Sequence, residues 1–339
     1  MFRKILCCII ILSVISVPCA FAEQVRKIKT IDCTPLYKGV DFSFDAEGHE
    51  VLFIQYKSSQ ESGQFVLRGE NGHFSGHLDM PRTYNGSNVF ITVSTMKQSI
   101  LIEKYNTRTL IPCPEPAEKQ EGRLSGITVC IDPGHSANCP TNSEPKGPGL
   151  SGYKKQGTGM AQGILTRRME SVVNLEIAFV LRDELLRQGA DVIMTRTDEE
   201  ACVSNMERCR IAEEGNADIM LRIHCNAVEN RNKTGIVVYF PRNSEYAKAL
   251  APIEEYRLWA DTLLEAVHTA ANVTNGTSSA TDEYTGNNWA KMPCFLLELG
   301  YMTTPSEDLL LSEEWYQQTL AEGIAEGVYR VCQLRGLVE

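Results

Sequence analysis

The spacing of hydrophobic residues changes near residue 125. Before that point, short alternating stretches of β-branched and aromatic residues predict strands, for example at 51–56, 64–67, 89–93 and 99–103. Two Asn-Gly pairs, at 71–72 and 85–86, are typical turn signals between such strands. About seven short strands in a segment of this length favour a small all-β domain, an immunoglobulin-like sandwich over residues 23–111.

From residue 125 onward, apolar strands alternate with helices. Continuous apolar runs predict strands at 127–131, 191–195, 219–224, 236–240 and 293–297. A helical period predicts helices at 170–187, 204–214, 245–271 and 313–334. Strands that are apolar on both faces are typical of a parallel sheet covered by helices on both sides. Residues 125–339 are therefore predicted to form an α/β domain with a mostly parallel, twisted sheet flanked by helices.

A linker is predicted between the two domains. Pro112, Pro114 and Pro116 follow one another closely and precede a charged stretch at 118–121. Proline fixes its own backbone and lacks an N–H, so a segment of this kind continues neither a sheet nor a helix. Residues 112–124 are predicted to be this linker.

The first residues resemble a targeting segment rather than part of a fold. Arg3 and Lys4 precede an apolar run that is too short to span a bilayer, and Ala20-Phe21-Ala22 follows it. We therefore expect residues 1–22 to be a secretory signal peptide, and the mature protein to be secreted, extracytoplasmic and free of the membrane. An uncleaved anchor, or lipid attachment at Cys19, is the alternative.

Charge and composition exclude several classes of protein. The chain is 43% hydrophobic and 22% charged, which is ordinary for a globular protein. Its 33 basic and 43 acidic residues give a net charge of −10, which argues against a nucleic-acid binder that neutralises phosphates. No sequence motif points to a nucleotide, flavin or haem.

Cysteines give weaker information. The chain has 12, and nine remain after residue 22, so an odd number is left for pairing. Cys33 and Cys113 bracket the first domain and could form a disulfide or stay reduced. Cys130 and Cys294 lie in apolar runs and are predicted to be buried thiols. No spacing matches a zinc ribbon, so cysteine is not predicted to bind a metal.

Polar residues stand where predicted strands of the second domain end. His135 follows the first of these strands, His224 ends the third, and Glu298 follows the fifth. Glu170 begins the first helix. Ligands of a parallel α/β sheet bind beyond the carboxyl ends of its strands, so these side chains are expected to converge there.

The residue types point to metal-dependent hydrolysis. Two histidines and one carboxylate, with a fourth position open, are the protein ligands of a catalytic zinc site. A further carboxylate nearby can accept the proton of an attacking water. Singly, each residue has a simpler interpretation: a hydrogen-bonded histidine, or Glu170 as a carboxylate favoured at a helix N-terminus. Glu298 is harder to explain that way, because an ionised carboxylate in an apolar strand is costly without a partner.

An ordered series of motifs over about residues 125–335 resembles the zinc-dependent N-acetylmuramoyl-L-alanine amidases. The motifs are IDPGH (131–135), TRRMESVVNLEIA (166–178), VIMTRTD (192–198), RIHCNA (222–227) and PCFLLELGYMTTPSED (293–308). The resemblance implies hydrolysis of the amide bond between N-acetylmuramic acid and L-alanine in bacterial peptidoglycan. It implies a Zn²⁺ cofactor with His135, Glu170 and His224 as ligands, and Glu298 as the catalytic glutamate.

Two departures from the family pattern leave questions open. The gap between His135 and Glu170 is long and rich in Gly and Lys, so Glu144 competes with Glu170 as the third ligand. Cys225 stands where a small Ala or Ser is usual. Because it neighbours His224 on a strand, its side chain is expected to face away from the metal.

Other candidates are weaker. His73 and His77 are expected to be exposed loop residues, and His268 lies in a predicted helix without an identified partner. Residues 157–163 are rich in glycine but lack the context of a nucleotide-binding loop, so we expect a flexible rim of the cleft. The stretch 280–293 resembles a segment that flanks the cleft in one branch of the family, and it contains the acidic residue Glu283.

Three functions are compatible with these features. The first is a secreted zinc amidase acting on peptidoglycan, with the sandwich as a spacer or a wall-contacting module. The second is a zinc peptidase that cuts within the stem peptide, since both bonds are amides. The third is a wall-binding protein without catalytic activity.

Overall fold

The structure is a computed structural model of the chain. It describes residues 31–36, 38–46, 51–58, 61–70, 72–80, 88–97, 100–110, 112–136, 139, 142–157 and 159–339. The predicted signal peptide lies outside these residues. Among the helices of the described part, none has both the length and the apolar character needed to cross a bilayer.

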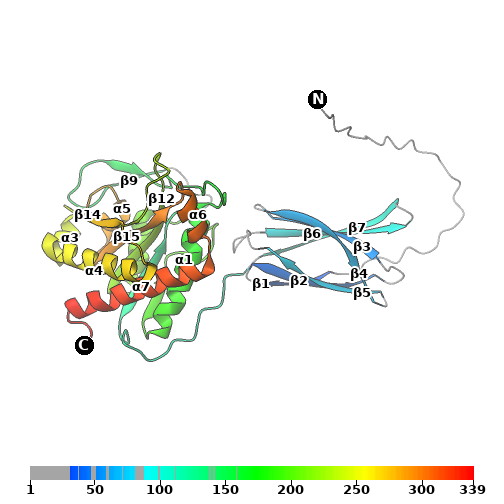
Figure 1. The fold of residues 1–339 in the computed structure, drawn as a ribbon, viewed down its shortest axis with the longest axis horizontal. Helices are drawn as coiled ribbons and strands as arrows, with labels where there is room; N and C mark the ends of the chain where they lie inside the picture. Colours follow the sequence, from blue (N-terminus) through cyan, green and yellow to red (C-terminus); the bar gives the residue numbers. More distant parts are fainter. Residues whose placement is uncertain are drawn as a thin grey trace, which may run out of the picture.

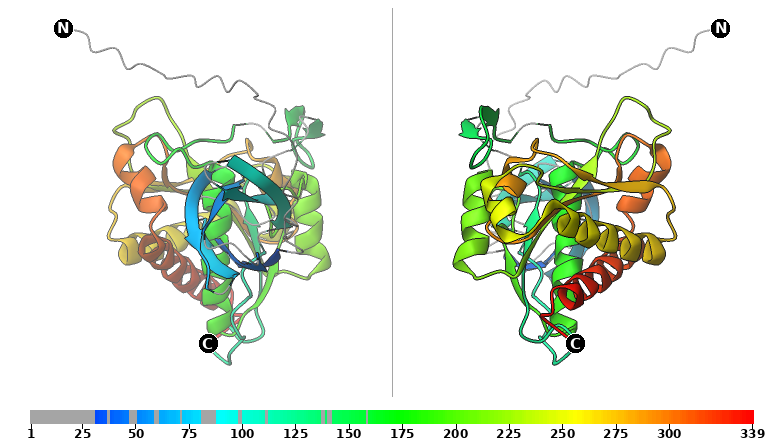
Figure 2. Two further views of the ribbon diagram at one scale, coloured as in Figure 1. Left: turned by 90° about the vertical axis from the view of Figure 1, so that its right-hand side faces the viewer. Right: turned by 90° about the vertical axis from the view of Figure 1, so that its left-hand side faces the viewer.

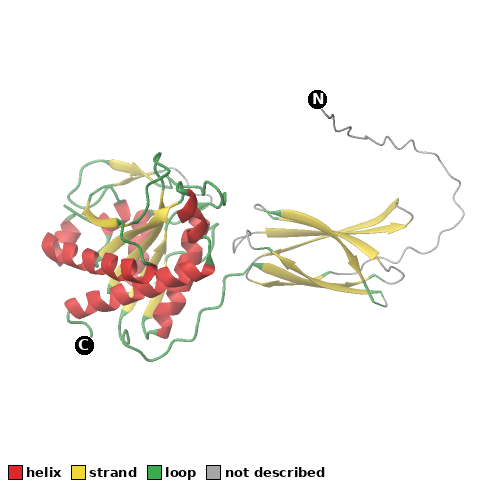
Figure 3. Cartoon of the chain, in the orientation of Figure 1, coloured by secondary structure: helices red, strands yellow, loops and turns green. Residues whose placement is uncertain are grey.

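The first part of the described chain consists of strands in two antiparallel sheets (Figures 1 and 3). One sheet has the order β1-β2-β5 and the other the order β4-β3-β6-β7. The strands are β1 (Asp32–Leu36), β2 (Gly39–Asp45), β3 (Val51–Lys57), β4 (Ser62–Arg68), β5 (His73–Asp79), β6 (Asn88–Lys97) and β7 (Ile100–Leu110). Pairing of β2 with β5 and of β3 with β6 crosses between sequential hairpins, as in immunoglobulin-like sandwiches. The predicted small all-β fold is confirmed.

Apolar side chains of both sheets meet in one core. Val40, Phe42 and Phe44 alternate with more exposed residues along β2, and they pack with Leu52 and Ile54 of β3. This period-two pattern places one face of each sheet inward.

The prediction that His73 and His77 are loop residues is wrong in part. Both are exposed, as expected, but they lie in β5, where they alternate with the buried Phe74 and Leu78. Each imidazole contacts an aspartate of β2; the Nδ1 atom of His77 lies 2.6 Å from an oxygen of Asp41. Although the strand contains Gly76, the alternation of buried and exposed residues determines the structure.

The second part of the chain is built on a six-stranded sheet of order β11-β8-β12-β15-β13-β14. Its strands are β8 (Thr128–Pro133), β11 (Asp191–Met194), β12 (Ile219–Asn226), β13 (Ile236–Phe240), β14 (Gly276–Ala280) and β15 (Cys294–Tyr301). Neighbouring strands run parallel except where β13 meets β15. This confirms the predicted mostly parallel sheet.

Helices cover both faces of this sheet (Figure 2). On one face α4 and α1 pack against α7, and Leu221 and Ile223 of β12 point into that core. On the other face α2 packs with α5, over Met220 of the same strand. The helices are α1 (Glu170–Arg187), α2 (Asn205–Glu214), α3 (Glu245–Leu250), α4 (Ile253–Ala271), α5 (Thr285–Trp289), α6 (Pro305–Leu311) and α7 (Glu314–Leu334). Alternate residues of one strand thus face different helical layers, as continuous apolar strands require.

Several elements differ from the sequence prediction. The helix predicted over 245–271 is divided into α3 and α4, because Ala251 is extended before Pro252 and proline cannot donate an N–H to the preceding turn. The hairpin of β9 (Ser143–Pro145) and β10 (Tyr153–Lys155) was not predicted, and neither were β14, α5 and α6. These elements are short, and β14 carries mostly small and polar residues without an apolar pattern.

The proline-rich segment lies along α1 instead of standing free. Arg182 of α1 donates hydrogen bonds to the carbonyl oxygens of Pro114 and Glu115, each at 3.1 Å. The Cys113 thiol contacts the same guanidinium, and Cys113 and Cys33 are both free thiols. Cys33 and Cys113 thus do not form the disulfide considered for them in this structure.

Candidate metal centre

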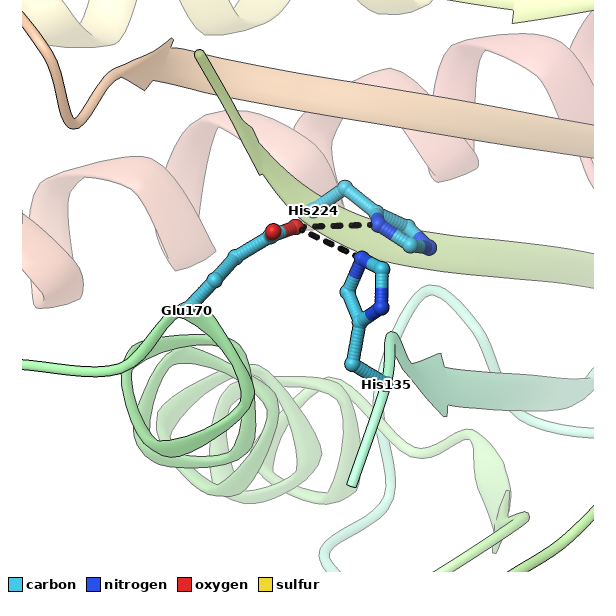
Figure 4. Close-up of side chains that lie close together, drawn as sticks. All are labelled: His135, Glu170 and His224. Atoms are coloured by element: carbon cyan, nitrogen blue, oxygen red, sulfur yellow. Dashed lines mark hydrogen bonds and ion pairs between the residues drawn. The ribbon is translucent and has the colours of Figure 1, made fainter. Parts of the chain in front are cut away.

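Three of the predicted site residues meet at the carboxyl edge of the sheet (Figure 4). His135 follows β8, Glu170 is the first residue of α1, and His224 lies near the end of β12. The Oε1 atom of Glu170 is 3.2 Å from Nε2 of His135 and 3.1 Å from Nδ1 of His224. The three potential ligand atoms all lie within 4.8 Å of one another.

These separations fit a tetrahedral metal ion. Two ligand atoms bound at about 2.0–2.1 Å to one tetrahedral Zn²⁺ lie roughly 3.3 Å apart. The distances of 3.1 and 3.2 Å from the Glu170 oxygen agree with that spacing. Among the described residues this is the cluster of His, Cys, Asp and Glu side chains that could hold a metal ion. Two imidazoles and one carboxylate are a donor set that suits zinc.

Glu170 is held from several sides. Its Oε2 atom accepts a hydrogen bond of 2.8 Å from the N–H of Ala161, and Oε1 accepts from the N–H of Cys225 at 3.2 Å. Burial acts to raise the pKa of Glu170, but hydrogen bonds from His135 and His224 outweigh it and hold that pKa well below its usual range. The carboxylate is therefore ionised and oriented toward the two imidazoles.

Burial also favours the uncharged form of His224. It lowers the pKa of His224 to about 4, although the hydrogen bond to Glu170 opposes the shift. His224 is therefore uncharged at neutral pH. A neutral imidazole is the form that binds metals. Its Nε2 atom is buried without a hydrogen-bond partner among the described residues.

The loop that carries His135 has a special backbone. His135 adopts a left-handed conformation with φ of 58°, which is uncommon for a residue with a side chain. Directly before it, Gly134 approaches His224 so closely that a Cβ atom there would clash with Cε1 of that ring. Glycine at position 134 thus leaves the space that the second imidazole occupies.

Two buried arginines fix this loop by its carbonyl oxygens. Arg208 donates to the oxygens of Pro133 at 2.6 Å and of His135 at 3.0 Å. Arg196 donates to the oxygens of Pro133 and Gly134, both at 2.9 Å. Because each guanidinium makes several bonds in a rigid fork, the strained loop keeps one conformation.

Asp132 binds two arginines, Arg208 and Arg222, beneath the site. It has no exposed surface and accepts from Arg208 at 2.6 Å, from Arg222 at 2.8 Å and from the hydroxyl of Thr195 at 2.5 Å. Burial acts to raise the pKa of Asp132, but the two arginines outweigh it and keep that pKa well below its usual range. We did not predict these supporting residues. The available signal was a charged residue inside an apolar strand, Asp132 in β8 and Arg222 in β12.

Glu298 lies beside the three residues but outside their cluster. It is paired with His224 in the parallel register of β12 and β15, so both side chains emerge on the same face of the sheet. Burial raises the pKa of Glu298 well above its usual range, and the nearby Glu170 raises it further. Its Oε2 atom has no hydrogen-bond partner among the described residues. A second carboxyl group therefore faces the site with an oxygen available.

A cavity of about 380 Å³ opens over these residues. Its wall includes the cluster, Glu298, Tyr284, Glu283 and Lys154, and also Gly157 and Gly159 of the predicted rim. Lys154, from β10, donates to the carbonyl oxygen of Glu283 and lies 5.5 Å from the ring of Tyr284. The stretch 280–293 thus flanks the cavity, and the β9–β10 hairpin contributes to its edge.

The three remaining candidates from the sequence lie outside the metal cluster. Glu144 is buried in β9 and accepts from the N–H of Met206 at 3.2 Å, which satisfies the start of α2. The cluster of potential ligands contains Glu170 and does not contain Glu144. Cys225 packs in the apolar core on the α1 face, away from the His224 side chain. His268 lies in α4, next to the backbone of Asn275.

Comparisons with known proteins identify a family. The model of the family Amidase_3, described as N-acetylmuramoyl-L-alanine amidase, matches residues 129–330. The probable cell wall amidase LytH of Staphylococcus aureus is 27% identical over 210 residues, which are 62% of this chain and 60% of that relative. The matched region thus spans less than two thirds of that protein's length.

Solved structures agree with this assignment. The N-acetylmuramoyl-L-alanine amidase from Clostridium difficile 630 is 28% identical with a TM-score of 0.50, over 62% of this chain and 98% of that one. The amidase Ami1 from Mycobacterium smegmatis is 19% identical with a TM-score of 0.56, over 63% of this chain and 100% of that one, and shares the fold. The motif series and the family match agree, and this chain belongs to the N-acetylmuramoyl-L-alanine amidase family.

Proposed function

We propose that this protein hydrolyses the amide bond between N-acetylmuramic acid and L-alanine in bacterial peptidoglycan, with one Zn²⁺ held by His135, Glu170 and His224. The observation that carries the proposal is the carboxylate of Glu170 at 3.1 and 3.2 Å from two imidazoles, beside the uncommitted carboxylate of Glu298. Membership of the amidase family supports the choice of this bond.

The metal and the protein have separate tasks in this reaction. When bound, Zn²⁺ supplies Lewis-acid activation of water and of the amide carbonyl group. Glu170 and neutral His224 donate their lone pairs, and Glu170 supplies one negative charge that is already present before binding. The arginines behind the His135 loop keep the third ligand in place.

Glu298 is proposed to move the protons. Its Oε2 atom is free to accept a proton from the attacking water and to pass it to the nitrogen of the leaving L-alanine. Glu298 pairs with His224 in the register of β12 and β15, so its side chain lies on the same face of the sheet as His224. A protonated nitrogen is needed because an amide anion is a very poor leaving group.

The proposed substrate sets where the protein works. Peptidoglycan lies outside the cytoplasm. This location agrees with the predicted signal peptide at residues 1–22, whose cleavage is proposed to free the chain from the membrane. The sandwich is proposed to act as a spacer or to contact the wall. Zn²⁺ and peptidoglycan are the only cofactor and partner that we propose.

Product analysis tests this function. Purified peptidoglycan is digested with the mature chain, with and without a chelator, and the products are identified by mass spectrometry. The proposal requires a new lactyl carboxylate on the glycan and a free amine on L-alanine, both lost in chelator and restored by Zn²⁺. A new carboxylate within the stem peptide would instead identify a peptidase. Intact peptidoglycan under all conditions would identify a wall-binding protein without activity.

A further inference from the structure

Two cysteines lie near each other at the rim of the metal cavity, one in its wall and one next to a wall residue. Cys139 comes four residues after His135 and forms part of the cavity wall. Cys202 lies just before α2 and is exposed, whereas Cys139 is half-buried, and both are free thiols in this structure. Neither residue takes part in the proposed chemistry.

The backbone around the two cysteines is held together by one side chain. The guanidinium of Arg208 donates to the carbonyl oxygen of His135 at 3.0 Å and to that of Val203 at 3.0 Å. Val203 is the neighbour of Cys202, and it lines the same cavity wall as Cys139. His135 and Val203 are thus brought together by one guanidinium, and Cys202 directly precedes Val203.

The two thiols also interact electrostatically. Burial, and after it the neighbouring Cys139 thiol, raise the pKa of the Cys202 thiol to about 11; the Cys139 sulfur lies 3.0 Å from the hydroxyl of Ser136. A disulfide requires the two Cα atoms to lie about 4.4–6.8 Å apart, so only cysteines on adjacent segments can form one.

The other described cysteines lack this combination of proximity and access. Cys130, Cys209 and Cys294 share a small apolar core under α2 and α5, where an oxidant has no access. Cys225 and Cys332 are buried in the main core. A thiol must be accessible to exchange with an external disulfide, so burial protects these five residues.

We propose that Cys139 and Cys202 form a disulfide that ties the loop following His135 to the start of α2, at the rim of the metal cavity. The oxidant is a disulfide compound, such as an extracytoplasmic dithiol–disulfide oxidoreductase in its oxidised form. The thiolate of Cys202 attacks one oxidant sulfur, which forms a mixed disulfide and releases one thiol. Cys139 then attacks the Cys202 sulfur and releases the second thiol. The protein loses two electrons and two protons, and the oxidant becomes two thiols.

The bridge stabilises the folded chain and the loop that presents a metal ligand. It closes the segment 139–202, which contains Glu170 and all of α1, and so restricts the unfolded chain. From the usual contribution of a disulfide, the oxidised form is expected to unfold with an equilibrium constant roughly 30- to 1,000-fold smaller than the reduced form.

Peptide mapping tests the bridge directly. The mature chain is treated with oxidised glutathione, free thiols are alkylated in denaturant, and a tryptic digest made without reductant is read by tandem mass spectrometry. Cys130 lies in the same tryptic peptide as Cys139, so Cys130→Ala serves as the matched control. The expected result is a peptide linked to the Cys202 peptide in the wild type and in Cys130→Ala, and its absence in Cys139→Ser.

Unfolding in urea, with and without a phosphine reductant, supplies the second readout. The wild type and a Cys113→Ser control are expected to lose stability on reduction, whereas Cys202→Ser is expected to show no effect of reductant. The proposal is overturned if Cys139 and Cys202 are both alkylated after oxidation, or if either is linked to a different cysteine. Reductant-independent stability of the wild type would also overturn it. None of these results depends on amidase activity.

Discussion

Replacing Asp132 by Asn tests whether the ion pairs beneath the metal site hold its loop. Asp132 is fully buried and accepts from Arg208, Arg222 and Thr195. Asn has nearly the same shape and keeps one oxygen, but its amide nitrogen cannot accept from a guanidinium. The substitution therefore leaves two buried positive charges without their negative partner.

The structure indicates a large effect on stability. Removing one partner of a buried ion pair typically costs about 3–5 kcal/mol, since the remaining charge stays buried. Arg222 still donates to Asn205 at 2.7 Å and Arg208 to Pro133 at 2.6 Å, so we expect a loss in this range rather than the sum for two pairs. Asp191 pairs with Lys119 at 2.6 Å, but the two side chains are 57% and 41% exposed. Asp191→Asn is the matched control, with an expected loss below about 1 kcal/mol.

The effect of pH has a definite sign. The pKa of Asp132 is lowered in the folded state, so its contribution to stability is fully present above the pKa of the unfolded chain, near 4. It decreases as the pH falls below about 4 toward the folded-state pKa. The difference in unfolding free energy between wild type and Asp132→Asn should therefore be largest at neutral pH and smaller in acid.

Urea denaturation followed by circular dichroism measures these quantities at neutral and acid pH. A loss for Asp132→Asn no larger than that for Asp191→Asn would contradict the interpretation of the network. So would a difference from wild type that grows as the pH is lowered.

Three further results are expected. His135→Ala and His224→Ala should each lose most of the bound zinc, measured by elemental analysis after dialysis, and full occupancy in both would remove them as ligands. Gly134→Ala should weaken zinc binding roughly 10- to 100-fold while the far-ultraviolet spectrum stays unchanged, because the new Cβ displaces the His224 ring; wild-type affinity would contradict this. Residues 112–339 should fold and cleave soluble muropeptide without the sandwich, and an insoluble or inactive fragment beside an active full chain would show that the sandwich is required.

Much of the fold could be predicted from the sequence, because burial imposes its own spacing. The continuous apolar run of β12 required helices on both faces of the sheet, and both layers are present. The break at Pro252 was visible, but the apolar pattern on both sides of it suggested a single helix. The β9–β10 hairpin left no comparable signal, since its short strands are held by long-range contacts such as that of Glu144 with Met206.

The candidate site was predictable to a similar extent. Strand ends in a parallel sheet meet at one edge, so His135, His224 and Glu298 could be grouped before any geometry was known. The pairing of Asp132 with Arg208 could not, because α2 lies far along the chain and spacing alone does not show which charge meets which. The left-handed backbone of His135 was equally hidden, since a non-glycine residue gives no sign of it.

Glu298→Gln, assayed for rate and bound zinc on the same preparation, tests the proposed mechanism most directly. Gln keeps the size of Glu and a hydrogen-bonding oxygen, but it does not accept the proton of the attacking water. We expect full zinc content and a rate on soluble muropeptide lower by at least about 10²–10⁴-fold, the usual contribution of general acid–base catalysis. Glu283→Gln, at an exposed carboxylate of the same cavity, is the control and should keep most activity. A near-normal rate of Glu298→Gln with full zinc would contradict the mechanism, and a parallel loss of zinc would show that Glu298 is a ligand instead.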